Sequence, residues 1–126
     1  ERSYHNCIDI QGHRFRFHHG DAIKFSGGVA GIICPLRKKI SQWNKAQYAD
    51  YDVLGHWHHF QLDWHFVISG CLVGVNPYAI SIGAETQPPT QTLMVIDRNH
   101  GNVITMPIFV EPKNASVDSA HSALAG

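Results

Sequence analysis

The sequence predicts an α+β fold that is rich in β-strand and has one main helix. Short alternating or apolar runs recur between glycine, proline and asparagine turns, which is typical of strands. Residues 36–47 have the spacing of a helix with one apolar face. The chain has 126 residues, enough for one modest core, so we expect a single domain over residues 1–126.

The amino-terminal segment predicts a β-hairpin. Residues 4–10 and 13–19 have strand character on either side of a Gln-Gly turn, and phenylalanines alternate with arginines in the second strand. The glycine-rich residues 26–31 follow. They lack the lysine of a nucleotide-phosphate loop, so we expect a flexible connection there.

A proline marks the start of the predicted helix, since Pro35 suits a first helical position. The side chains that would share its apolar face are Leu36, Ile40, Trp43 and Ala46 or Gln47. The basic side chains of this segment lie mostly off that face. We therefore expect them to form a solvated outer surface rather than an anion-binding site.

Short strands follow the helix, and a second β-hairpin closes the fold. The segments with strand character are 52–54, 59–63, 65–69 and 71–75. Residues 92–96 and 103–106 flank a polar turn and predict the hairpin. From residue 111 the chain is small and polar, so we expect residues 111–126 to be a flexible tail.

Composition limits the classes of function. Ten basic residues balance ten acidic ones, so the charge does not indicate binding to nucleic acid or to an anionic membrane. No apolar run approaches the roughly 20 residues that span a bilayer. Cys7, Cys34 and Cys71 form neither a disulfide framework nor a paired-cysteine metal motif, and we expect buried free thiols in the cytoplasm. Glu1 in place of methionine indicates a processed, trimmed or incomplete chain.

Histidine is unusually frequent, with ten copies. Two clusters lie where predicted strands end, in Phe-His-His-Gly-Asp at residues 17–21 and Gly-His-Trp-His at residues 55–58. Ligand sites in open α/β sheets lie outside the carboxyl ends of strands, and alternate residues of an extended segment point the same way. Neutral imidazoles suit Mn, Fe, Zn or Ni. We therefore predict a divalent metal site formed by His19, His56 and His58.

The remaining histidines give no such pattern. His18 and His59 are expected to point to the opposite side of their strands from the predicted ligands. The others are expected to be ordinary hydrogen-bonded residues, namely His5, His13, His65, His100 and His121.

In this order, separated by a loop and a basic helix, the two clusters resemble the final motifs of the calcineurin-like metallophosphoesterase superfamily. His19-Gly20 is similar to that family's His-Gly motif, and residues 55–58 are similar to its Gly-His-x-His motif. Residues 68–70 stand where many members have a short strand and an Asn-Gly turn after the last motif. Residues 74–79 and 88–92, with the closing hairpin, are similar to phage and bacterial members. The likeness covers roughly residues 14–110 and implies the β-rich carboxy-terminal half of an α/β/β/α sandwich.

The resemblance also implies roles for individual residues. His19 and His56 would bind one ion of a two-metal centre and His58 the other, with a phosphate ester as the substrate. Asp21 would orient His19 from behind the metal ligands, or else cap the following loop. Trp57, between two of the ligands, is expected to pack rather than to stack on a substrate.

The sequence departs from the family pattern before these motifs. The family's Asp-x-His, Gly-Asp and Gly-Asn-His-Asp or -Glu motifs should precede His19, and residues 1–18 contain none of them. The two-metal centre cannot assemble without those side chains. We therefore expect one ion at most and very weak or absent hydrolysis.

Two alternatives stay open. The spacing of His56, His58, Asp63 and Gly70 is similar to the first motif of the cupins, small metal-binding β-barrels, but no second motif follows. A contact between His19 and the later histidines would favour a phosphoesterase half over a cupin. The other alternative is a non-enzymatic fragment. Strand edges and apolar surface left uncovered by a missing half would favour a homo-oligomer.

Overall fold

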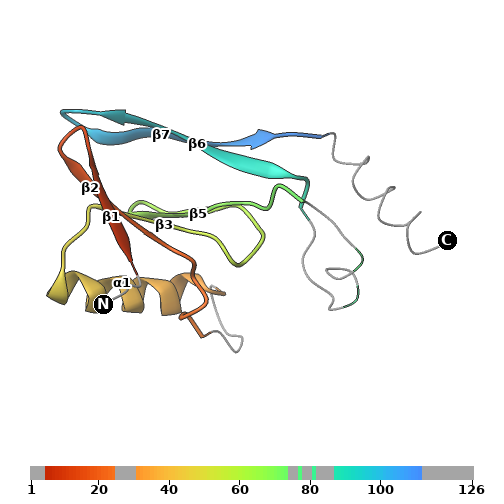
Figure 1. Ribbon diagram of the computed structural model, residues 1–126, viewed down its shortest axis with the longest axis horizontal. Coiled ribbons are helices and arrows are strands. Elements are labelled where there is room, and N and C mark those ends of the chain that lie inside the picture. The colour runs from red at the N-terminus through yellow and green to blue at the C-terminus, as the bar shows by residue number, and fades with distance from the viewer. Residues whose placement is uncertain (1–4, 25–30, 74–76, 78–80, 82–86, 112–126) are drawn as a thin grey trace.

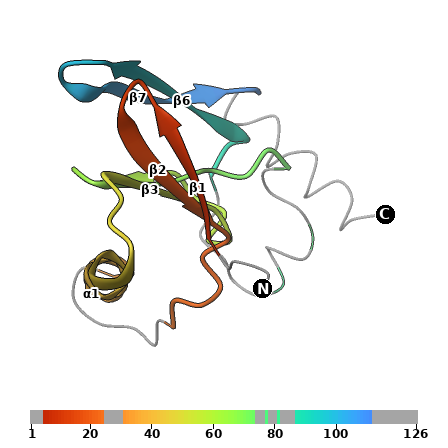
Figure 2. The same ribbon diagram turned by 60° about the vertical axis from the view of Figure 1, so that its left-hand side comes forward.

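Three layers build the protein in the computed structural model, which describes residues 5–24, 31–73, 77, 81 and 87–111. A five-stranded sheet lies between helix α1 on one side and the two-stranded hairpin β6–β7 on the other, in both views of the ribbon (Figures 1 and 2). The predicted α+β class is therefore confirmed.

The central sheet mixes antiparallel and parallel pairs in the order β1-β2-β3-β5-β4. Its strands are β1 (Asn6–Ile10), β2 (His13–His18), β3 (Tyr51–Leu54), β4 (Gln61–Leu62) and β5 (Phe66–Ile68). Strands β1 and β2 form the predicted hairpin, whereas β2, β3 and β5 run parallel. The carboxyl ends of these three strands therefore lie at one edge of the sheet.

Helix α1 (Ile33–Ala46) begins three residues before the predicted start, so that Pro35 lies within the first turn. The first-turn amides have no acceptor within the helix, and a proline there removes no hydrogen bond. Leu36 and Ile40 are buried as predicted. Ala46 is exposed, so the buried face ends one turn earlier than expected.

The main core lies between α1 and the sheet. Its buried members are Ile23, Ile32, Leu36, Ile40, Leu54, Phe66 and Ile68. On the opposite face of the sheet, Phe15 is buried and stacks on Tyr51 with ring centroids 4.9 Å apart. Alternation along β2 and β3 therefore divides their side chains between a helix face and a hairpin face.

The second hairpin is longer than predicted. Strands β6 (Thr90–Asp97) and β7 (Gly101–Phe109) enclose a turn of three residues, 98–100. The Asp97 carboxylate closes this turn by accepting hydrogen bonds from the backbone amides of Asn99 and His100, each at 2.9 Å. Gly101 has φ +78°, and a Cβ there would collide with the Tyr51 hydroxyl. Only glycine suits this position.

Some local predictions fail. Strands expected at 59–63 and 65–69 shrink to β4 and β5, and residues 71–73 are not strand although 71–75 had strand character. These pieces are too short for alternation alone to define, because pairing with neighbours decides their limits. The glycine-rich residues 26–30, residues 74–75 and the expected tail beyond residue 111 lie outside the described residues.

The three thiols are free, but the prediction that they are buried is wrong. Cys34 is exposed on the first turn of α1, and Cys7 and Cys71 are half-buried. Within the described part of the chain, no helix is long and apolar enough to cross a membrane.

Candidate metal-binding site

The predicted histidine segments meet at the carboxyl edge of the parallel strands. His18, Leu54 and Ile68 are in register at the ends of β2, β3 and β5. The Gly55 amide donates to the His19 carbonyl at 3.2 Å, which extends the strand pairing into the two loops. Sequence segments 37 residues apart thus become neighbours at this edge.

Gly20 makes the close approach of these loops possible. It is buried with φ +101°, and a Cβ there would lie 3.1 Å from Leu54 Cδ1 and 3.2 Å from the Gly55 carbonyl. Both the conformation and the space favour glycine. The glycine after His19 therefore has a structural reason in this fold, independent of any ligand.

His19 and His56 form an exposed pair. The distance from His19 Nε2 to His56 Nδ1 is 3.2 Å, and the ring centroids are 4.9 Å apart. Two nitrogens that bind one tetrahedral ion at 2.0–2.1 Å lie about 3.3 Å from each other. The two nitrogens are within hydrogen-bond distance, and their spacing also suits two ligands of a single ion. A phosphoesterase half requires this contact, whereas a cupin does not.

The loop that carries His56 and His58 is not extended, contrary to expectation. Both residues adopt left-handed backbone conformations, with φ 67° and 58°. Both side chains are exposed, while Trp57 between them packs against the core, as predicted. The described residues hold no cluster of three or more His, Cys, Asp or Glu side chains arranged to bind a metal. The participation of His58 therefore stays a prediction.

The same holds for the role of Asp21. This residue lies in the turn after Gly20, which the Ile23 amide closes by donating to the Gly20 carbonyl at 3.2 Å. At the other end of the site, His59 lies 3.0 Å from the Trp57 carbonyl and 3.2 Å from Gln61 Oε1. His59 thus supports the loop rather than joining the histidine pair.

A buried ion pair beneath the site was missed by the sequence analysis. Arg16 and Asp52 are each 1% exposed and form two hydrogen bonds, at 2.7 and 3.0 Å. The Arg16 guanidinium also donates to the Gln47 carbonyl and to Asn44 Oδ1, each at 2.8 Å. The alternation of phenylalanines and arginines along this strand predicts that Arg16 faces solvent. The signal that was overlooked is Asp52, an acidic residue at the start of the otherwise apolar strand predicted at 52–54.

Two histidines complete this buried cluster. His18 Nε2 lies 3.4 Å from Asp52 Oδ1, and the His18 ring meets Trp43 edge-on at 4.7 Å. Burial alone would raise the pKa of Asp52, but contacts with His18 and Arg16 outweigh it and hold that pKa below its usual value. Burial lowers the pKa of His5, and the nearby His18 and Arg16 lower it further. His18 therefore faces the core, away from the exposed pair, as predicted.

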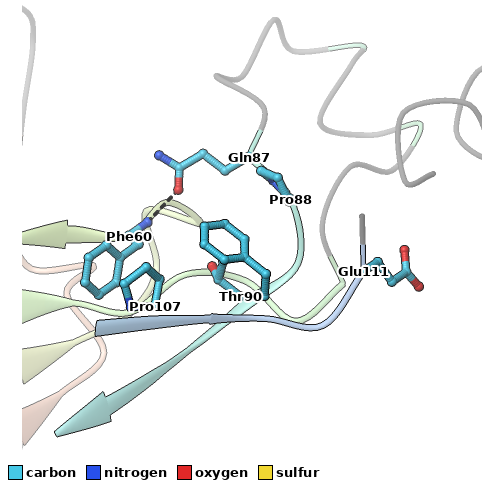
Figure 3. A pocket seen from close by; sticks show the side chains of 7 residues that line it. Phe60, Gln87, Pro88, Thr90, Pro107 and Glu111 are labelled. Carbon is cyan, nitrogen blue, oxygen red and sulfur yellow. Dashed lines mark hydrogen bonds between the residues drawn. The ribbon is translucent and has the colours of Figure 1, made fainter. Parts of the chain in front are cut away.

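An apolar cavity of about 570 Å³ lies beyond the loop, on the hairpin side (Figure 3). The Phe60 amide donates to Gln87 Oε1 at 2.8 Å and holds the cavity's two walls together. Pro88 and Pro107 contribute to the lining, and Glu111 is the charged residue among those that the structure describes. None of the described lining residues would provide a cationic partner for an anionic phosphate group.

Helix α1, the five-stranded sheet and the hairpin together match a partial metallophosphoesterase-like fold. The predicted fold class is confirmed in this form. Two solved structures share the fold, and both are of Vps29 from Entamoeba histolytica. The wild-type protein in complex with Zn²⁺ has a TM-score of 0.55 and 16% identity, over 85% of this chain and 61% of that one. A single-residue variant has a TM-score of 0.57 and 15% identity, over 88% and 64%.

The present chain therefore spans less than two thirds of the length of these structures. At such identities the likeness concerns the fold alone. No protein-family model and no curated protein sequence matches the chain.

Proposed function

We propose that this chain derives from the metal-dependent phosphoesterases and binds one divalent transition metal ion at His19 and His56, with His58 as a third ligand. The 3.2 Å spacing of the histidine pair at the carboxyl edge of the sheet carries the proposal. The Zn²⁺ complex of the Vps29 neighbour supports it, because a protein of the same fold takes such an ion. Mn, Fe, Zn and Ni all suit imidazole ligands.

The backbone of the histidine loop also supports a ligand role. A non-glycine residue in the left-handed region costs about 1–2 kcal/mol, and His56 and His58 both adopt it within three residues. Such conformations concentrate at ligand sites, where the surrounding structure enforces them. Here the Trp57 amide, which donates to the Gly55 carbonyl at 2.8 Å, fixes the bend between them.

The substrate class is a phosphate ester, and turnover is very weak or absent. A divalent ion would act as a Lewis acid on a phosphoryl oxygen. The chain's own part is limited to two or three imidazoles that hold the ion, because the upstream carboxylates of the family are missing from residues 1–18. We further propose that the chain corresponds to the carboxy-terminal half of a phage- or bacterial-type member. Its free thiols favour a cytoplasmic location.

Metal analysis of the purified full chain tests the site directly. After loading with Zn²⁺ or Mn²⁺ and dialysis, the wild type should retain about one ion, and His56→Ala should lose it. His58→Ala should weaken retention if that residue is the third ligand. His65→Ala is the matched control, because His65 is an exposed histidine outside the cluster. Equal metal content in the wild type and His56→Ala would reject the site.

Hydrolysis of bis-p-nitrophenyl phosphate tests activity separately. We expect a rate close to background for the metal-loaded chain, since residues 1–18 hold none of the family motifs that would complete the centre. A rate far above background that His56→Ala abolishes would show that this chain forms a working centre. In that case the missing family motifs are dispensable.

A second candidate function is self-association through the hairpin β6–β7. Residues that pair across the hairpin share a face, which places five apolar residues on its outer side. These residues are 42–48% exposed and consist of Leu93, Val95, Ile104, Met106 and Ile108. We call them the outer hairpin face. An apolar strip of this kind favours a partner, and we propose a second copy of the chain.

Light scattering after size-exclusion chromatography tests this candidate. The wild type should elute as a dimer or larger assembly, and Met106→Glu on the outer hairpin face should shift it towards the monomer. Leu62→Glu provides a control, because Leu62 is an exposed apolar residue outside the hairpin. A monodisperse wild-type monomer at high concentration would exclude the proposed assembly.

A further inference from the structure

A basic cavity of about 630 Å³ lies between the turn at residues 22–24 and the first half of α1. Three of its lining residues are lysines. Lys24 comes from the loop after β2, and Lys38 and Lys39 come from the helix. The sequence gives no reason to group Lys24 with the helix lysines, because the fold alone brings the two segments together.

The charge of this cavity is not balanced within the described residues. None of its lining residues there is acidic, and no ion pair of the described part involves these three lysines. The first turn of α1 also lacks an acidic residue, so the partial positive charge of the helix amino terminus adds to that of the lysines. Asp21, the nearest carboxylate along the chain, is not among the lining residues.

The topology places this cavity at the same edge of the sheet as the histidine pair. In the unit β2–α1–β3 the two strands are parallel, so the connecting helix returns antiparallel to them. The amino terminus of α1 therefore lies at the carboxyl edge of the strands, where ligands bind in open α/β sheets. Figure 1 shows the orange loop after β2 descending to that end of the helix.

We propose that the cavity binds a small phosphorylated molecule with at least two anionic groups. Lysine ammonium groups bind phosphate as point charges, and three of them require more than one negative charge for balance. The volume falls within the range of small-molecule pockets. The balanced charge of the whole chain disfavours a nucleic acid strand. This site does not depend on metal binding at His19 and His56.

Calorimetric titration of the full chain with inorganic pyrophosphate in EDTA tests the proposal. We expect saturable binding to one site. The double variant Lys38→Gln/Lys39→Gln should weaken it by about tenfold or more, since charge-assisted hydrogen bonds are the strong ones. Lys24→Gln should weaken it by a smaller factor. Lys45→Gln is the matched control, because Lys45 lies in the last turn of the same helix, away from the cavity.

Further arms separate the remaining explanations. His56→Ala should leave pyrophosphate binding unchanged. If this variant lost pyrophosphate binding, the anion would bind at the histidine pair instead, and the proposal would be overturned. An equal loss in the single variants Lys45→Gln and Lys24→Gln would indicate general charge attraction and overturn it as well. Co-sedimentation with vesicles containing phosphatidylinositol bisphosphate distinguishes a lipid headgroup from a soluble phosphate. The absence of binding to both probes would reject the site.

Discussion

The layers on the two faces of the central sheet differ in how completely their apolar side chains are buried. On the helix face, Leu36 and Ile68 are completely buried, and even the charged pair Arg16–Asp52 is enclosed. On the other face the hairpin β6–β7 covers the sheet, but the outer hairpin face remains exposed to solvent. Apolar side chains are therefore more completely enclosed on the helix face than on the outer side of the hairpin.

The connections explain this difference. Helix α1 joins β2 to β3 and therefore packs on the strands that flank it in sequence. The hairpin contacts the sheet layer partly through single hydrogen bonds, such as those from Thr92 to Ser69 and from Asn102 to Tyr51. The chain spans only 61–64% of its structural neighbours.

Breaking the buried ion pair should have the largest effect. Asp52→Ala leaves the Arg16 guanidinium buried without its counter-charge, and we expect a loss of about 3–5 kcal/mol in the free energy of unfolding. Urea denaturation measures it. The double variant Arg16→Met/Asp52→Leu removes both charges and should lose less than the single variant. A loss below about 1 kcal/mol for Asp52→Ala would mean that the pair is solvated.

Truncations on the two layers compare their packing directly. Leu36→Ala should cost about 2–5 kcal/mol, because it opens a cavity in the core. Ile108→Ala should cost no more than about 0.5 kcal/mol in the isolated monomer, because that side chain is 45% exposed. Thermal denaturation over a range of protein concentrations gives both values. A concentration-dependent loss for Ile108→Ala would indicate that a second copy covers the outer hairpin face.

Acid should weaken the helix face progressively. The lowered pKa of Asp52 means that the folded chain binds fewer protons, so its contribution is full above about pH 4 and is lost as pH falls through the folded value. The lowered pKa of His5 gives an earlier decline that starts near pH 6.5, where the unfolded chain begins to protonate. Urea midpoints at about pH 7.5, 5.5 and 3.5 should therefore fall in that order. Asp52→Asn should reduce the fall in the urea midpoint between about pH 5.5 and 3.5.

The smallest effect concerns the histidine loop. His58→Gly should be about 1 kcal/mol more stable than His58→Ala, because only glycine adopts φ 58° without strain. The same pair of substitutions at His65, which lacks a positive φ, should favour alanine or show no difference. Denaturant midpoints of the metal-free variants provide the comparison. Equal stability of the two His58 variants would show that the loop relaxes out of this conformation.

Elements with a clear period were predictable from the sequence. Both hairpins and the helix follow from alternation, a turn or a one-sided apolar face, and their existence did not depend on the rest of the fold. Strands β4 and β5 are too short to carry such a signal, and pairing defines them. The burial of Arg16 was also hidden, because it depends on Asp52 in a neighbouring strand and on Asn44 in the helix.

The candidate site likewise has parts that the sequence predicts and parts that it does not. The approach of His19 and His56 follows from the rule that strand ends gather at one edge, so sequence reasoning reached it. The conformation of the loop was expected to be extended, and the left-handed residues carry no local signal except the tolerance of histidine for that region. The lysine cavity depends on the path of the chain after Gly20, which no periodicity describes.

The contact between Tyr51 and the hairpin also bears on local opening of the native state. The Tyr51 hydroxyl accepts a hydrogen bond from the Asn102 amide at 3.0 Å. It lies beside Gly101, where a Cβ would collide with it. Regions held by few contacts open locally, at a lower free energy than global unfolding. The Asn102 amide would then exchange its hydrogen while the helix face stays closed. The hairpin would act as a separately fluctuating unit of the native state.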